Sequence, residues 1–447
     1  MERENHIIEK PEIAVFWFRR DLRVDDNHAL YNALISGNPV LPVFIFDTEI
    51  LSQLEEKSDR RVNFIFQTLE AINREFQHNY QSGIQFYCGS PEEVFLEIIN
   101  SYHVKSVFCN EDYEPYAIRR DEKVKAVLNE NAVSFHSFKD QVVFHKDDIV
   151  KKDGNPYTVY TPYSNAWLTK FRENSPEHFP SEEHLDRLWK FTPENFGIEK
   201  TGFLTTGYKY ISPQTDEDII INYADTRNFP YLTHGVSGMS VHLRFGTVSI
   251  RKLALQTAPL SEVYLKELIW REFFMQILYH FPRVMNHSFK EKYDNISWEL
   301  NEEHFGRWCE GKTGYPIVDA GMRELNSTGV MHNRVRMITA SFLTKHLLID
   351  WRWGEAYFAN KLLDYDLAAN NGNWQWVAGC GCDAAPYFRI FNPAEQQKKF
   401  DPEMNYVKKW IPEYGTKHYP DPIVEHTFAR NRVLERFKKA LEIKQNY

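Results

Sequence analysis

The sequence predicts two domains, an α/β Rossmann-like N-terminal domain with a parallel sheet and an all-α C-terminal domain, joined by a long linker. Three observations support this. The chain of 447 residues is too long for one ordinary core. Short apolar strands alternate with helical patterns in its first third, and helical periodicity dominates after residue 220. We place the domains at residues 11–145 and 220–447, with the linker at 146–219.

The N-terminal strands are short runs of β-branched and aromatic residues. We expect them at Ile13–Phe18, Val40–Phe46, Ile84–Tyr87, Ser106–Cys109 and Val133–Phe138. Helical patterns lie between them at 59–78, 91–102 and 115–130. This alternation is typical of a doubly wound parallel sheet. No G-x-G-x-x-G motif follows any of these strands, so the pattern does not predict a dinucleotide site there.

The rest of the chain divides into an irregular part and a helical part. From residue 151 to about 219, Pro, Glu, Thr and Gly interrupt the periodicity, and loops of this length are uncommon within one compact unit. This favours a linker. Helices are then expected at 250–256, 261–280, 316–325, 332–349, 354–362 and 364–374.

Composition excludes several classes of protein. The net charge of −9 argues against a surface coated in basic charge, although a local basic face is compatible with it. Five cysteines, an odd number, favour a reduced, cytoplasmic setting. No apolar run approaches the ~20 residues that span a membrane. Cys380-Gly381-Cys382 lacks a second ligand pair, so we expect no metal site.

The stretch Met331–Pro393 combines apolar helical periodicity with many polar and charged groups. It holds four tryptophans, four aspartates, four arginines and the pair Asn370-Asn371. An unpaired buried charge costs several kcal/mol, on the order of 3–5 when its partner is removed, so these charges need partners. We therefore expect a polar site among these helices.

Three segments of this stretch resemble a known family. Asp364–Asp366, Leu367–Trp376 and Arg389–Pro393 are similar to the flavin-binding helical domain of photolyases and cryptochromes, and most similar to class I cyclobutane pyrimidine dimer photolyases. The resemblance runs from Val15 to about Trp410. It implies a monomeric lyase that binds FAD and damaged DNA. It also implies light-driven repair, in which excited FADH⁻ passes an electron to a pyrimidine dimer flipped out of the duplex.

The resemblance assigns a set of FAD contacts. They are Tyr223, Ser237, Met239, Ser240, Asn333, Arg336, Asp364, Asp366 and Asn370. In the family the serines hold the diphosphate, and the Arg336–Asp364 pair lies against the flavin. Asp366 accepts from the ring N3–H, and Asn370 faces N5. Two positions depart from the family pattern, because Val236 stands for the usual Thr and Asn228 for the usual Asp.

The resemblance also assigns substrate and electron-transfer residues. Those for DNA or the dimer are Arg227, Glu267, Trp270, Asn333, Arg334, Met337, Trp376, Arg389 and Gln396. Glu267 and Trp270 are three residues apart, so one helix face presents both. By resemblance, Glu267 hydrogen-bonds a thymine carbonyl and stabilises the dimer's radical anion. The catalytic set is Glu267 and Asn370, with Trp298, Trp351 and Trp374 as an electron-transfer chain.

Each motif also has an ordinary structural interpretation. Ser237–Ser240 reads as a helix N-cap, Glu267 and Trp270 as parts of an amphipathic helix, and single tryptophans as core residues. The main functional rival is a cryptochrome, a blue-light photoreceptor with the same FAD fold. Asn370 favours repair, since plant cryptochromes carry Asp there. A light-independent flavin oxidoreductase is a second rival, but the sequence shows no nicotinamide fingerprint.

Two further positions concern the lesion and the antenna. His332-Asn333 stands where (6-4) photolyases carry His-His, which disfavours that lesion. A second, light-harvesting chromophore is compatible with the resemblance. Ala117, Met285 and Asn286 replace the residues that hold a folate in relatives, so a deazaflavin, a flavin mononucleotide or no antenna are left open.

Overall fold

The computed structural model describes residues 10–208, 213 and 216–442, and the chain forms two compact units. The first unit consists of residues 1–145, 175–213 and 242–255, and the second of 146–174, 214–241 and 256–447. The first break, after His145, coincides with the predicted end of the N-terminal domain. The segment expected to be a linker, 146–219, is instead divided between the two units. Residues 242–255, which we placed in the helical domain, pack with the first unit.

The first unit is built on a five-stranded sheet with the order β3-β2-β1-β4-β5, in which every strand pair is parallel. Its strands are β1 (Glu12–Phe18), β2 (Val40–Asp47), β3 (Gln85–Gly89), β4 (His103–Asn110) and β5 (Ser134–Phe138). Central β1 is buried from Ile13 to Phe18, because strands covered on both faces carry continuous apolar residues. The predicted parallel sheet is confirmed.

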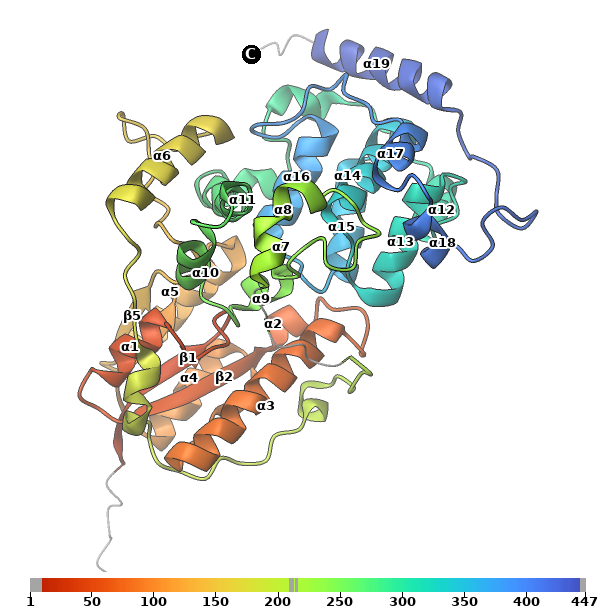
Figure 1. Ribbon diagram of the computed structural model, residues 1–447. Coiled ribbons are helices and arrows are strands. Elements are labelled where there is room, and N and C mark those ends of the chain that lie inside the picture. Colours follow the sequence, from red (N-terminus) through yellow and green to blue (C-terminus); the bar gives the residue numbers. More distant parts are fainter. Residues whose placement is uncertain (1–9, 209–212, 214–215, 443–447) are drawn as a thin grey trace, which may run out of the picture. The chain divides into compact units, whose positions relative to one another are not determined.

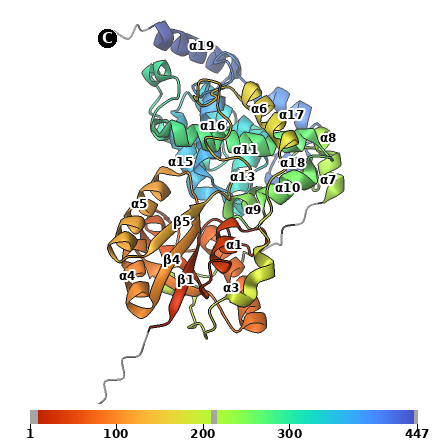
Figure 2. The same ribbon diagram turned by 90° about the vertical axis from the view of Figure 1, so that its left-hand side faces the viewer.

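Helices cover both faces of this sheet. The helical elements of the unit are α1 (His28–Leu34), α2 (Thr48–Leu51), α3 (Arg60–Tyr80), α4 (Pro91–Ser101), α5 (Pro115–Glu130), the 3₁₀ turns η1 (Ser181–Arg187) and η2 (Ile198–Thr201), and α10 (Ile250–Thr257) as far as residue 255. Figure 2 shows α4 and α5 on one face and α1 and α3 on the other. The arrangement is doubly wound, as the alternation of strands and helices predicted.

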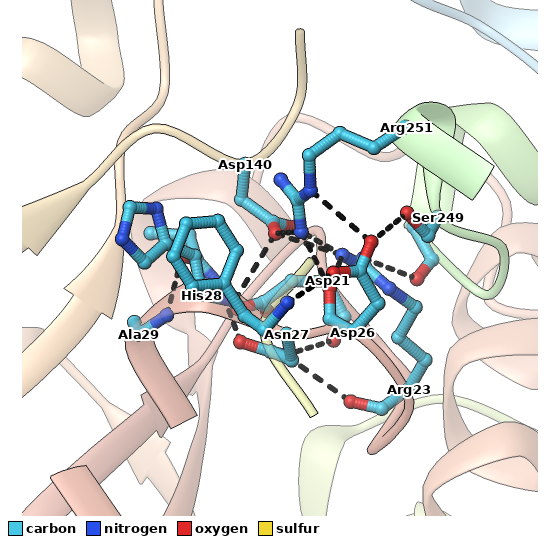
Figure 3. Close-up of polar contacts among 12 residues, drawn as sticks. Asp21, Arg23, Asp26, Asn27, His28, Ala29, Asp140, Ser249 and Arg251 are labelled. Carbon is cyan, nitrogen blue, oxygen red and sulfur yellow. Dashed lines mark hydrogen bonds and ion pairs between the residues drawn. The ribbon is translucent and has the colours of Figure 1, made fainter. Parts of the chain in front are cut away.

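A buried ionic network explains why residues 242–255 belong to the first unit (Figure 3). The Asp140 carboxylate accepts from Arg23 at 2.7 Å and from Arg251 at 2.9 Å. Arg251 also donates to Asp26 at 3.1 Å, and Ser249 donates to the same carboxylate. All four charged side chains are at most 6% exposed. Removing one member would leave a buried charge without compensation, which typically costs about 3–5 kcal/mol.

The second unit is helical (Figure 1). Its elements are α6 (Tyr160–Glu173), α7 (Glu217–Ile221), α8 (Tyr223–Thr226), the start of α9 (Ser240–Phe245), α11 (Glu262–His280), η3 (Pro282–Met285), η4 (Glu291–Asn295), α12 (Glu302–Cys309), α13 (Pro316–Thr328), α14 (Asn333–Ser341), η5 (Phe342–His346), α15 (Trp351–Lys361), α16 (Leu367–Ala378), α17 (Pro393–Phe400), α18 (Asn405–Trp410) and α19 (His426–Glu442). Among the described residues, none of these helices is long and apolar enough to cross a membrane.

The predicted helix 332–349 ends earlier than its apolar pattern suggested. Regular α-helix stops at Ser341, a π-helical turn follows, and Leu348 has φ +56°. The next helix, α15, starts after Asp350, whose side chain accepts from the Arg352 N–H. Because every residue from Ile338 to Ile349 is buried, an apolar pattern could not mark where the helix ends.

Helix α16 begins at Leu367 and not at residue 364. Asp366 is its N-cap, and the Asp366 side chain accepts from the Ala369 N–H at 3.0 Å. Asp364 therefore lies in the preceding turn. The cap orients this turn, which carries two of the carboxylates assigned to the flavin.

Candidate cofactor and substrate site

Helices α14, α15 and α16 enclose a recess with about 540 Å³ of empty space, counting the part open to solvent. Its lining includes many of the residues assigned from sequence, namely Asn333, Arg336, Met337, Asp364, Asp366, Asn370 and Trp374. The apolar part of the lining comes from residues such as Ala340, Phe358, Leu362 and Val377. A mostly apolar recess with a few convergent polar groups is the usual form of a small-molecule site.

The predicted Arg336–Asp364 pair is formed. Arg336 Nη2 donates to both carboxylate oxygens of Asp364, at 2.8 and 3.1 Å, and Arg336 Nε donates to the Met331 carbonyl at 2.7 Å. The Asp364 side chain is 3% exposed, whereas that of Arg336 is 26% exposed. The acid is thus neutralised at the wall of the recess, and the guanidinium plane is fixed by three hydrogen bonds.

Asn370 is oriented by a residue that the sequence analysis missed, Glu355. Asn370 Nδ2 donates to Glu355 Oε1 at 2.8 Å and to the Glu355 carbonyl at 3.1 Å. Burial raises the pKa of the Glu355 carboxyl. Because the amino end of the Asn370 amide is held in this way, its oxygen is the end available to accept a hydrogen bond from a ligand. From sequence, Glu355 could not be distinguished from a solvated acid on α15.

A group of cations lies next to the recess. Arg227 forms an ion pair with Glu267 at 2.6 Å, in which the two side chains are 22% and 30% exposed. Arg334 donates to Asn228 Oδ1 at 2.5 Å and lies 4.4 Å above the Phe400 ring. Burial, and then the positive charges of Arg227 and Arg389, lower the pKa of Arg334. Arg227 and Arg389, the two other arginines assigned to DNA, therefore both lie within electrostatic reach of Arg334.

The other assigned DNA residues are partly or fully exposed on neighbouring elements. Arg389 is exposed in the turn before α17. Gln396 is partly exposed on α17, the helix that provides Phe400 beneath Arg334. Trp376 is partly exposed near the end of α16. Trp270 is partly exposed on α11, one turn after Glu267, with one face covered by the Tyr160 ring.

Three of the other residues assigned to FAD, Tyr223, Ser237 and Met239, lie around Tyr264, and Ser237 is one of the two serines assigned to the diphosphate. Ser237 Oγ lies 3.0 Å from Tyr264 Oη, and the Met239 N–H donates to Ser237 Oγ at 3.4 Å. The Tyr223 ring packs edge-on against Tyr264 with centroids 5.0 Å apart. Ser240 is exposed at the first position of α9. None of these residues lines the recess itself.

The three tryptophans assigned to electron transfer have different surroundings. The Trp374 ring packs against Phe358 at 5.0 Å and Trp308 at 6.2 Å between centroids. Trp351 is 1% exposed. Trp298 is partly buried and packs edge-on against Phe437 of α19 at 5.9 Å. Trp351 and Trp374 belong to one hydrophobic core cluster, and Trp298 packs against it. The use of these three tryptophans as an electron-transfer path stays a prediction.

Comparison with known proteins identifies the family. Residues 14–182 match the family model described as DNA photolyase, and residues 264–417 match the FAD binding domain of DNA photolyase. A deoxyribodipyrimidine photo-lyase from Synechococcus is 36% identical, over 94% of this chain and 95% of the relative. The chain belongs to the photolyase family.

Solved structures agree with this assignment. A class III photolyase from Agrobacterium tumefaciens has a TM-score of 0.84 and 32% identity, covering 99% of this chain and 100% of that one. A cryptochrome from Synechocystis has a TM-score of 0.84 and 25% identity, covering 96% of this chain and 99% of that one. A photolyase and a protein named a cryptochrome thus share this fold with the present chain at the same TM-score, so the fold alone does not distinguish between functions within the family.

The residues of this photolyase-family chain fit an FAD. The recess presents carboxylate and amide oxygens from Asp366 and Asn370, which can accept from ring N–H groups, and a fixed guanidinium from Arg336. Val236 lacks the hydroxyl of the family's usual Thr, whereas the neighbouring Ser237 carries one, which lies 3.0 Å from Tyr264 Oη. The observed donors and acceptors therefore match those that a flavin edge requires.

Proposed function

We propose that this protein repairs cyclobutane pyrimidine dimers in DNA using light, as a deoxyribodipyrimidine photo-lyase. The observation that carries the proposal is the recess between α14 and α16, because it is lined by five of the residues matched to FAD contacts on sequence alone, namely Asn333, Arg336, Asp364, Asp366 and Asn370. The cation group around Arg334 lies directly beside it. Damaged DNA is therefore the partner that we propose.

Bound FAD in its reduced form would supply the absorption of light and the electron. The protein's own residues would orient that group. Arg336 and Asp364 form a rigid, neutralised pair at one edge, and the Asn370 oxygen accepts a hydrogen bond at the position fixed by Glu355. Phe358 and Trp374 would form part of the apolar wall against which the flavin packs.

The rim would hold the dimer and its DNA. Glu267, kept in place by Arg227, would bind the polar edge of a pyrimidine, and Trp270 and Trp376 would stack on its faces. Base–aromatic stacking contributes roughly 1–3 kcal/mol per base, which offsets the few kcal/mol, on the same order, needed to flip a damaged pair. Arg227, Arg334 and Arg389 would contact phosphates, which fixes register without reading sequence.

The finer assignments rest on particular residues. Asn333, in place of the second His of the (6-4) enzymes, supports the cyclobutane dimer as substrate. Asn370 supports repair over the cryptochrome-type photoreceptor, which is the alternative function. The class I placement rests on the motif Leu367–Trp376, while a class III structure is among the relatives at 32% identity.

Variants of helix α11 test the site. Glu267→Gln and Trp270→Ala should each weaken binding of dimer-containing DNA and slow repair at limiting DNA, with FAD content unchanged. Glu262→Gln is the matched control, since Glu262 lies on the same helix and pairs with Lys266 at 2.6 Å on the exposed surface. Normal binding and repair in both rim variants would show that the substrate site has been misplaced.

A further inference from the structure

Helix α6 brings an aromatic residue to the substrate rim from a segment that the sequence predicted to be linker. The Tyr160 ring stacks on Trp270 with centroids 3.6 Å apart and planes inclined by 5°. Figure 1 shows α6 beside α11, which carries Trp270, and the two helices are in direct contact. A parallel stack this close covers one face of the indole. Trp270 nevertheless stays partly exposed.

Tyr160 is built into the structure and is not a mobile cover. Its ring is buried at 9% exposure, and its hydroxyl donates to the Lys266 carbonyl at 2.8 Å. Its backbone N–H donates to Asp383 at 3.1 Å. Phe273, on α11, packs edge-on against the same ring at 5.8 Å. Restraints on the ring, hydroxyl and backbone hold Tyr160 in one position.

The whole helix is docked on α11 by buried contacts. Trp167 Nε1 donates to Glu272 at 2.8 Å, and Glu272 is 4% exposed. Gln276 donates to the Tyr157 carbonyl at 2.8 Å just before α6 begins. Tyr163 packs against Phe273 at 5.3 Å. These contacts place α6 relative to Trp270 independently of the Tyr160 ring.

Tyr160 also lies in the electrostatic field of the rim. Burial, together with the Glu267 carboxylate, raises the pKa of the Tyr160 phenol, and Arg227 acts in the opposite direction. Both charged residues belong to the proposed dimer site. Tyr160 is therefore close to the substrate rim, although no residue before Arg227 was assigned to that rim from sequence.

We propose that Tyr160 is a positioning residue for the lesion. By stacking on one face of Trp270, Tyr160 holds the indole at a fixed angle, and the opposite face of the indole stacks on a flipped pyrimidine. The inference rests on the proposed function. An indole that is already held in place loses little conformational freedom when a base stacks on it, and this preorganisation increases the affinity for the lesion. Helix α6 is thus part of the substrate site, outside the matched FAD-binding domain of residues 264–417.

The test measures binding of dimer-containing and undamaged oligonucleotides by the FAD-loaded protein. Tyr160→Leu should raise the Kd for dimer-containing DNA roughly two- to tenfold, the range expected for loss of one aromatic pair. The Kd for undamaged DNA, the FAD content and the repair rate at saturating DNA should be unchanged. Tyr160→Phe, which keeps the ring, should recover most of the affinity.

Two comparisons separate a positioning role from general damage to α6. Phe171 lies on the same helix, and the ring that it stacks on among the described residues is Trp167, at 4.9 Å between centroids. Phe171→Leu removes this ring and should bind dimers normally. In a Trp270→Ala background, Tyr160→Leu should have no further effect, because Tyr160 acts through the indole. If the Tyr160→Leu protein loses FAD, Tyr160→Met is used in its place, both alone and in the Trp270→Ala background.

Each outcome bears on one proposal. Equal affinity of Tyr160→Leu and wild type for the dimer, or an equal loss in Phe171→Leu, would overturn the role of Tyr160 while leaving repair intact. A further loss of dimer affinity when Tyr160→Leu is added to Trp270→Ala would also overturn the role of Tyr160. A wild-type protein that neither prefers nor repairs dimer-containing DNA would instead overturn the proposed function itself.

Discussion

Gly354 is the position at which packing around the recess can be tested most sharply. It lies in α15, where a Cβ would overlap the six-membered ring of Trp374 and approach Leu343 Cδ2 to 2.6 Å. Gly354 thus allows α15 and α16 to approach closely. Gly354→Ala forces Trp374, which lines the recess, to move.

The magnitude follows from two opposing effects. Replacing a mid-helix Gly by Ala gains about 1 kcal/mol of helix propensity. Overpacking a buried contact typically costs about 1–3 kcal/mol, so Gly354→Ala should lower the free energy of unfolding by up to about 2 kcal/mol. Gly306→Ala is the control, because Gly306 lies in α12 with no atom within 4 Å of its Cβ position, and it should be neutral or stabilising.

Thermal melting and the absorbance of bound FAD report both effects. Gly354→Ala should melt earlier than Gly306→Ala and retain less FAD, since the shifted indole narrows the recess. A Gly354→Ala protein with the stability of Gly306→Ala and a full complement of FAD would refute the packing described for α15 and α16.

Three further predictions concern the DNA, the electron path and pH. Arg334→Ala should reduce the slope of log K against log[salt] for binding of duplex DNA by about 0.9, the value for one phosphate contact. Arg436→Ala is the control and should leave the slope unchanged, because it removes a guanidinium that is bound to Glu299. Equal slopes for Arg334→Ala and wild type would contradict the phosphate role of Arg334. Trp374→Phe should abolish photoreduction of oxidised FAD and spare repair by pre-reduced protein, and normal photoreduction would exclude the proposed chain. Burial raises the pKa of Glu355 above its usual 4.5, so the folded state holds this proton more tightly and stability falls as pH rises above about 4.5. In thermal melts, the stability of Glu355→Gln relative to wild type should therefore increase as the pH rises from 4 to 7. A difference in stability between the two proteins that does not change with pH would contradict a buried Glu355 carboxyl.

Much of the recess was predictable from sequence. The charged residues between Met331 and Pro393 had to find partners, and the pairing of Arg336 with Asp364 follows from that requirement together with the family motif. The strands were predictable for a similar reason. Each is a short apolar run between helical patterns, and all five formed within a few residues of their expected positions.

The residues that were missed depend on contacts between distant segments. Tyr160 lies far before Trp270 in a Pro- and Thr-containing stretch with little periodicity, and only tertiary packing turns that stretch into α6. The placement of residues 242–255 was missed likewise, because the pairing of Arg251 with Asp26 and Asp140 has no local signature. Local patterns cannot encode such pairings.

The most direct test of the account is repair of a thymine-dimer oligonucleotide by the purified, reduced protein, in blue light and in the dark, with a (6-4) lesion in parallel. We predict light-dependent loss of the cyclobutane dimer alone. Bound FAD without repair of either lesion would contradict the account and favour a photosensor. Repair of the (6-4) lesion would show that Asn333 does not determine the lesion class.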